Sequence, residues 1–349
     1  YSSVGQLYTP QDKEEIMFYK EDKSGQILEE GINEAGSMSS WIAAATSYSS
    51  HGVNTVPFYI YYSMFGFQRI GDLAWAAGDM QARGFLIGAT AGRTTLAGEG
   101  LQHQDGHGLI LAGTIPNCIS YDPTFGYELA VIVQDGMRRM YEKQESVFYY
   151  ITTMNENYVH PAMPKGAEPG IIKGMYKLRT GGKKKNKVQL LGSGTILREV
   201  MAAADLLRDE WDVDADIWSA TSINELTREA QDCDRWNRLH PAATAKVPYV
   251  AQCFDGVKGP FIAATDYIRN YAEQLRKWVP GRYEVLGTDG FGRSDTRAQL
   301  RKHFEVNSYH VVVAALKALA DEGQLPAAKV TEAIAKYGID AEKTNPLFA

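Results

Sequence analysis

Short apolar runs alternate with helix-length segments along this chain, and this alternation restricts the possible folds more than any other feature of the sequence. Between residues 20 and 160 the runs are rich in aromatic and β-branched residues and almost free of charge, which is typical of parallel strands covered on both faces. Parallel strands joined by crossover helices form an α/β fold. We therefore predict strands at 56–62, 85–89, 117–121 and 146–153, and helices at 33–47, 68–81 and 123–143.

The last of these helices has a candidate start signal. Asp122 is suited to the N-cap and Pro123 to the first helical position, where a missing N–H costs nothing.

A break in the pattern divides the chain in two. Residues 160–170, HPAMPKGAEPG, contain three prolines and two glycines, a composition typical of linkers. The alternation then resumes, with strands predicted at 187–191, 215–220, 249–253 and 261–264, and helices at 196–209, 296–304, 308–321 and 327–337. The sequence predicts two doubly wound α/β domains, at 1–163 and 164–349.

Charge and hydropathy exclude several classes of partner. The 349 residues carry a net charge of -6 with a pI near 5.7, so no general positive field attracts nucleic acid or acidic lipid. No apolar run reaches the ~18 residues that a membrane span needs, and no basic segment precedes an apolar stretch. We predict a cytoplasmic protein with no nucleic-acid and no membrane partner. The one basic cluster, at 183–187, is interpreted as a solvated turn behind two glycines.

The three cysteines do not indicate disulfides. Cys118, Cys233 and Cys253 are widely spaced, and none lies in a CxxC pair or beside a histidine. We predict that they are buried as small apolar groups.

Segments that follow the strands are the places to look for a ligand site, because ligands of open parallel sheets lie beyond the carboxyl ends of strands. The strand at 56–62 leads into SMFGFQR. Tyr62 and Phe65 there are suited to a flat wall for a ring-shaped ligand. The alternative is that both rings are core beneath the next helix.

A glycine-rich loop follows the strand at 85–89. Residues 92–108, GRTTLAGEGLQHQDGHG, contain five glycines and two histidines, and such a long loop is seldom a mere connection. His103 and His107 have the i, i+4 spacing of a zinc site, but Gly106 and Gly108 argue against a helix there and no third ligand is placed. Imidazoles on a loop are better suited to proton transfer or to holding an anionic substrate. A structural role for the histidines is the remaining alternative.

Glu34 begins a predicted helix after GIN, and it has two interpretations. A glutamate in the first turn favours the positive end of the helix dipole. A carboxyl group beside an aromatic wall can also exchange a proton with a ring nitrogen, because an apolar pocket raises its pKa.

Together these segments resemble a known family. GINE, PFYIYYSMFGFQRIGDLAWAAGD, GRTTLAGEGLQHQDGH, IPNCISYDP, QLLGSG and LGTDGFGRSD are similar, in this order, to the C-terminal part of the homodimeric decarboxylating first component of bacterial pyruvate dehydrogenase complexes. The resemblance covers essentially the whole chain. It implies a pyrimidine-binding domain of the transketolase type, incomplete at its N-terminus, followed by a transketolase-like C-terminal domain.

The resemblance also implies cofactors and site residues. The cofactors are thiamine diphosphate and Mg²⁺, and the substrate is pyruvate. Glu34 matches the glutamate that hydrogen-bonds a pyrimidine ring nitrogen and promotes loss of the thiazolium proton. Phe65 matches the ring stacked on the pyrimidine, and Tyr62 and His103 match groups that face the pyruvate adduct. His107 is taken as a further catalytic candidate.

The family implies protein partners as well. They are a second copy of the chain in a homodimer and the lipoyl-bearing dihydrolipoamide acetyltransferase, which receives the acetyl group.

The resemblance also implies a role for the aromatic run. An apolar wall there would keep water from the reacting centre.

The sequence departs from the family pattern at the metal site. The family holds magnesium through Gly-Asp-Gly and a later Asn in a separate domain, and this chain has no Gly-Asp-Gly. We therefore predict no metal ligands here and expect those for Mg²⁺ in an absent N-terminal domain. The segment at 287–292, GTDGFG, matches a different part of the family, and LLGSG at 190–194 is interpreted as a strand-to-helix turn rather than an anion site.

The chain opens on Tyr1 with no methionine, and we interpret it as a fragment that is inactive alone. Two alternatives remain open: another thiamine enzyme of the transketolase type, or a noncatalytic dimerisation or docking fragment.

Overall fold

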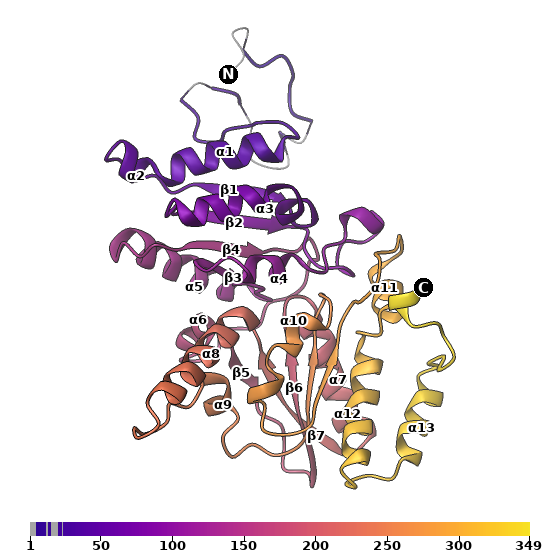
Figure 1. Cartoon of the computed structure of the whole chain (residues 1–349). Coiled ribbons are helices and arrows are strands. Elements are labelled where there is room, and N and C mark those ends of the chain that lie inside the picture. The colour runs from indigo at the N-terminus through magenta and orange to yellow at the C-terminus, as the bar shows by residue number, and fades with distance from the viewer. Residues whose placement is uncertain (1–4, 12, 15–19, 23) are drawn as a thin grey trace.

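Two β-sheets lie one above the other in the computed structural model, which describes residues 5–11, 13–14, 20–22 and 24–349 (Figure 1). The first sheet is entirely parallel, in the order β1-β2-β4-β3. Its strands are β1 (Phe58–Tyr62), β2 (Phe85–Ala89), β3 (Cys118–Tyr121) and β4 (Phe148–Thr152). The carboxyl ends of these strands therefore meet at one edge.

The second sheet has the order β5-β7-β6-β8-β9, and only β5 runs antiparallel to its neighbour. Its strands are β5 (Tyr176–Arg179), β6 (Asn186–Gly192), β7 (Val213–Ser219), β8 (Phe261–Ala264) and β9 (Tyr283–Leu286). A mostly parallel sheet of this kind needs helices on its faces, because each crossover returns the chain over the sheet.

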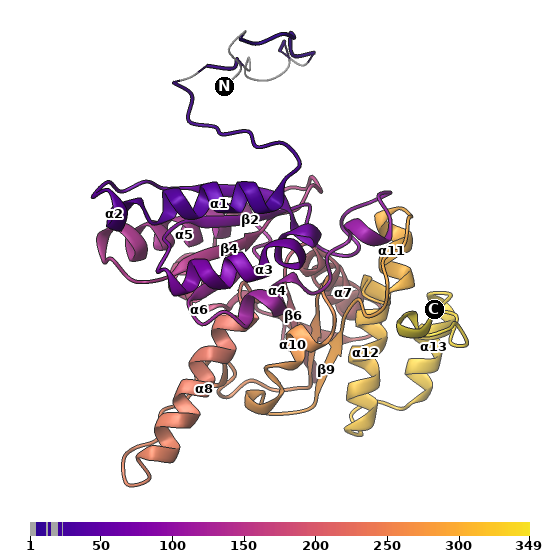
Figure 2. The same cartoon turned by 45° about the horizontal axis from the view of Figure 1, so that its top comes forward.

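Helices cover both faces of the first sheet (Figure 2). On one face lie α1 (Glu34–Ala45), α3 (Ser63–Asp79) and α4 (Gly108–Gly113), and on the other lies α5 (Gly126–Met137), which continues into a π-helical turn, η2 (Arg138–Glu142). Trp41, Ile70 and Leu109 pack from the first group of helices onto the inner face of the sheet. The short α2 (Ser47–Ser50) and α6 (Glu168–Lys173) complete this half of the chain.

In the second half, α7 (Ile196–Glu210), α12 (Ser308–Asp321) and α13 (Ala328–Lys336) share one apolar cluster with the sheet. On the other face lie α8 (Ile223–Leu239), α9 (Tyr249–Cys253) and α10 (Asn270–Glu273), with the far end of α8 projecting from the body (Figure 2). The remaining elements are α11 (Arg297–His303), η1 (Leu101–His103), η3 (Arg276–Trp278) and η4 (Pro346–Phe348). The cluster around α8 is continuous with the core of the first sheet, so the two halves share buried apolar surface.

These features confirm the α/β fold with parallel sheets, but several local predictions were wrong. Residues 249–253, predicted as a strand, form helix α9. Asp122 is not an N-cap, because α5 begins at Gly126 and the Glu128 side chain accepts hydrogen bonds from the N–H groups of Thr124 and Phe125 at 2.6 and 3.0 Å. The sequence did not predict β5, β9 or α8.

Strand β1 differs from the buried strand that was predicted. It lies at the edge of its sheet, and Phe58, Ile60 and Tyr62 on its outer face are 48%, 66% and 47% exposed. Alternation of side chains explains the pattern, since Tyr61 points to the covered face and is buried.

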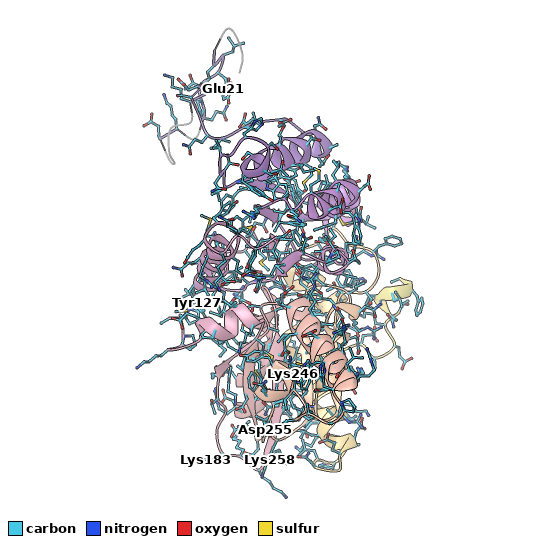
Figure 3. All side chains as sticks on the ribbon, turned by 60° about the vertical axis from the view of Figure 1, so that its left-hand side comes forward. Glu21, Tyr127, Lys183, Lys246, Asp255 and Lys258 are labelled. Atoms are coloured by element: carbon cyan, nitrogen blue, oxygen red, sulfur yellow. The ribbon has the colours of Figure 1, made fainter. Side chains whose placement is uncertain are left out.

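The cysteines and the basic cluster follow their predictions in most respects. All three thiols are free; Cys118 and Cys233 are buried and Cys253 is half-buried, and burial raises the pKa of Cys233 to about 11. Lys183 lies at the outer end of the second half of the chain (Figure 3), and its neighbour Lys184 pairs with Asp212 at 3.2 Å. None of the described helices combines the length and the apolar character that crossing a bilayer requires.

Candidate functional site

The aromatic run lies where β1 ends and α3 begins. Helix α3 starts at Ser63, five residues before the predicted start, so Phe65 lies in its first turn and Tyr62 is the last residue of the strand. The two rings stand edge to face, with centroids 6.2 Å apart. Tyr62 is exposed and Phe65 is half-buried, so both rings are accessible from outside rather than enclosed in the core.

Glu34 lies beside this aromatic pair. It is the first residue of α1, whose start is fixed by the Asn33 side chain accepting a hydrogen bond from the N–H of Gly36 at 3.1 Å. The Glu34 carboxylate accepts a hydrogen bond from the Arg69 guanidinium at 2.6 Å. Arg69 also lies over the Phe65 ring, 4.3 Å from its centroid. One planar cation therefore contacts both the carboxylate and the ring.

His103 completes the cluster from the glycine-rich loop. It ends η1, and its ring is 5.0 Å from that of Phe65 and 6.0 Å from that of Tyr62, edge to face with each. Its Nε2 is 3.8 Å from a carboxylate oxygen of Glu99. Its Nδ1 is buried and has no hydrogen-bond partner among the described residues.

His107 lies farther along the same loop and is held differently. It precedes α4, and its Nε2 is 2.7 Å from the amide nitrogen of Gln68 on α3. The loop thus brings both histidines to the start of α3, but only His103 meets the aromatic pair, edge to face.

Two hollows in the described part of the chain lie away from these residues. One, of about 720 Å³, is lined by α5, η2 and α6, and the other, of about 300 Å³, lies beside Thr152 and the start of α5. None of the five predicted site residues lines either hollow. We place the candidate site at the carboxyl end of β1 because ring, carboxylate and imidazole groups converge there.

The turn at 190–194 does not offer a free anion site. Gly194 precedes α7 with a positive φ of 49°, and a Cβ there would lie 2.8 Å from the Asp122 carboxylate. The Asp122 carboxyl group therefore lies against this turn, which agrees with the predicted strand-to-helix turn.

The same carboxyl group is fully buried, and burial raises its pKa to about 7.

Sequence reasoning missed three residues at this place: Arg69, Glu99 and Asp105, whose buried carboxylate accepts a hydrogen bond from the Ser63 hydroxyl at the start of α3. Arg69 follows Phe65 by four positions, so the i, i+4 rule would have placed both on one helix face once the helix start was known. No group of three or more His, Cys, Asp or Glu in the described part of the chain is arranged to hold a metal ion.

Comparison with known proteins gives consistent matches along the chain. Residues 1–161 match the family model described as the pyruvate dehydrogenase E1 component middle domain, and residues 174–307 match the transketolase-like C-terminal domain. The chain is 66% identical to the pyruvate dehydrogenase E1 component of Pseudomonas aeruginosa over 99% of its length, and 62% identical to that of Escherichia coli over 100%. It covers 40% and 39% of these relatives, or about two fifths of their length.

Solved structures of similar fold include transketolases. The enzyme from Campylobacter jejuni matches with a TM-score of 0.60 at 17% identity, over 79% of this chain and 38% of that one. A split-gene transketolase, described as an inactive β4 tetramer, matches with a TM-score of 0.57 at 17% identity, over 83% of both chains. At this identity the likeness shows the transketolase-like fold alone.

Proposed function

The chain belongs to the family of pyruvate dehydrogenase E1 components, and from this premise we propose that it is part of a thiamine diphosphate enzyme that oxidatively decarboxylates pyruvate. The acetyl group would be passed to a lipoyl group, which is reduced as it is acetylated, and so feed acetyl-CoA synthesis. The observation that carries the proposal is the meeting of the Glu34 carboxylate and the Phe65 ring on one guanidinium.

The residues at this place fit the pyrimidine half of the cofactor. The Arg69 guanidinium is planar, lies over Phe65 and donates to Glu34, and this supports the proposal that a planar hydrogen-bonding ring binds at the same two groups. Glu34 and Phe65 would hold the pyrimidine ring, with Tyr62 beside them. We propose that Mg²⁺ and its ligands lie in a part of the enzyme outside this chain.

Thiamine diphosphate, when bound, supplies an electron sink for the electron pair released as CO₂ leaves. Glu34 would hold a proton at a pyrimidine nitrogen. His103, whose ring lies 5.0 Å from that of Phe65, is suited to binding or moving a proton on the substrate side. Tyr62 and Phe65 would exclude water from the reacting centre. His107 is less suited to proton transfer, because its Nε2 already contacts Gln68.

We propose a homodimer in the cytoplasm, with the lipoyl-bearing dihydrolipoamide acetyltransferase as a second partner. The exposed outer face of β1, with Phe58 and Ile60, supports an interface, because exposed apolar patches of this kind commonly mark protein contacts.

Product analysis of the full-length protein tests the proposed reaction. With thiamine diphosphate, Mg²⁺ and pyruvate, we expect CO₂ release and acetylation of an added lipoyl domain. Transfer of two-carbon units between sugar phosphates without CO₂ release would instead indicate a transketolase.

The 349-residue chain alone is expected to be inactive and to bind thiamine diphosphate with a Kd of about 1 mM or weaker, because a site restricted to the pyrimidine half forfeits the diphosphate interactions. Isothermal titration calorimetry with and without Mg²⁺ measures this directly. Tight, magnesium-dependent binding by this chain would contradict the assignment of the diphosphate site to another part of the enzyme.

A further inference from the structure

The carboxylate of Asp105 joins the glycine-rich loop at 92–108, which carries His103 and His107 and is called the histidine loop below, to the start of α3. Asp105 is fully buried. One of its oxygens accepts a hydrogen bond from the Ser63 hydroxyl. The other accepts from the backbone N–H groups of His107 and Gly108, at 3.0 and 2.8 Å. A single side chain therefore connects the segment that carries both histidines with Ser63, which directly follows Tyr62.

The hydroxyl of Ser63 is itself fixed from the sheet. It lies 2.9 Å from the hydroxyl of Tyr150 on β4, and because Ser63 donates to Asp105, Tyr150 donates to Ser63. All three side chains are at most 2% exposed. A buried network of hydrogen-bonded side chains is rigid when every polar group in it has a partner. The network of Tyr150, Ser63 and Asp105 therefore holds the sheet, α3 and the loop in one arrangement.

The neighbouring residue anchors the loop from the other side. Gln104, also fully buried, donates to the carbonyl oxygens of Leu96 and Arg293 at 3.0 and 2.9 Å and accepts from the N–H of Arg293 at 2.8 Å. A Cβ at Gly106 would lie 2.3 Å from the buried Arg93 guanidinium, so the turn after Asp105 is closely confined. His103 precedes these two anchors directly.

We propose that Asp105 is a positioning residue for the histidine loop, setting His103 and His107 against the start of α3. Asp105 hydrogen-bonds neither imidazole ring. It accepts instead from the backbone N–H of His107 and from the hydroxyl of Ser63 at the start of α3. The consequence for catalysis rests on the proposed function, whereas the positioning role does not.

Chemical labelling separates the two. In the full-length protein, diethyl pyrocarbonate modification of each histidine is followed by mass spectrometry in Asp105→Ala, Asp105→Asn and Ser63→Ala. Asp105→Ala is expected to raise the labelling rates of His103 and His107 about fivefold. The hydroxyl of Ser63 and the N–H groups of His107 and Gly108 lose their acceptor, and this destabilises the position of the loop. Ser63→Ala removes the link to α3 alone and is expected to give a smaller rise. Asp105→Asn keeps one acceptor oxygen and is expected to restore rates within about twofold of the wild type.

Two other histidines and a distant aspartate are the controls. His51 is exposed and His310 is part-buried on α12, and both rates are expected to stay unchanged. Asp255→Asn, at the end of the molecule remote from the site (Figure 3), is expected to leave all rates unchanged.

Activity measurements complete the test. Asp105→Ala is expected to lower kcat about tenfold with KM for pyruvate within about twofold, since misplaced groups cost rate more than ground-state binding. Unchanged labelling of His103 in Asp105→Ala and Ser63→Ala would overturn the proposal, as would a parallel rise at His310, which would mean a general loss of structure. If labelling changes as expected but the wild type does not decarboxylate pyruvate, the positioning role stands and the proposed function falls.

Discussion

Replacing Glu34 by glutamine in the full-length protein is expected to lower kcat for pyruvate decarboxylation by about 100-fold or more, the range typical of a lost acid or base group. Glutamine keeps the length and hydrogen-bonding capacity of the side chain but cannot give up or take a proton at neutral pH. The change also removes the charge that pairs with Arg69. Steady-state CO₂ release, measured with saturating cofactor, gives kcat and KM separately.

A matched substitution at an exposed glutamate controls for the loss of one negative charge. Glu342→Gln, near the C-terminus and exposed, is expected to leave turnover unchanged. The Glu34 variant should also lose rate with little change in KM if the carboxyl group acts mainly in the transition state. Turnover equal to that of the wild type would remove Glu34 from the chemistry and favour the alternative of a noncatalytic docking module.

Strands and helices with strong periodic patterns were the most predictable elements. The strands at 85–89 and 261–264 and the helix at 308–321 match the structure at both ends. The helix of 223–239 was missed because its many charged residues conceal the apolar stripe. Its start signal was present in Ser222, which accepts a hydrogen bond from the N–H of Glu225 at 3.1 Å.

The short run at 249–253 shows the limit of periodicity. Five mainly apolar residues fit either a strand or one buried turn of helix. Val250 is buried, and the hydroxyl of Tyr249 donates to the carbonyl oxygen of Met175 at 3.0 Å, so tertiary contacts rather than local preference determine the conformation.

At the candidate site, the sequence indicated the residue types but not their connections. Tyr62, Phe65 and His103 were brought together by resemblance, and the structure places their rings within 6.2 Å of one another. Nothing in the sequence spacing indicates that Ser63 and Asp105, 42 positions apart, share a hydrogen bond. Contacts of this kind depend on how the loop returns to the sheet, which local patterns do not record.

The stability of the 349-residue chain is expected to fall by about 1 kcal/mol for each pH unit between pH 5 and 7 through Asp122. Burial raises the pKa of this carboxyl group from 3.8 to about 7, so the folded state holds a proton that the unfolded chain has released. The contribution of Asp122 to the free energy of unfolding is fully present below about pH 4 and is lost as the pH rises through 7. Asp266, across the boundary between the halves of the chain, raises the pKa further by its charge.

The contacts of Asp122 explain why ionisation is unfavourable there. Thr152 donates a hydrogen bond to one carboxylate oxygen at 2.7 Å, but the other oxygen is buried without a partner among the described residues. The same residue joins the two halves of the chain, because its N–H donates to the carbonyl oxygen of Thr221 at 2.8 Å and its carbonyl oxygen accepts from the N–H of Gly194 at 3.2 Å. Ionisation therefore puts an unsatisfied charge at the boundary between the two sheets.

Urea unfolding of Asp122→Asn across pH 5 to 8 tests this assignment. The variant cannot ionise, so the fall in the free energy of unfolding over this range is expected to be about 3 kcal/mol smaller than in the wild type. Asp255→Asn changes an exposed carboxylate and is expected to preserve the wild-type slope. If Asp122→Asn follows the wild-type pH dependence, another group carries the titration. Asp266, whose pKa burial also raises, is then the residue to replace, because its carboxylate accepts hydrogen bonds from Thr94 and Thr95 at the same boundary.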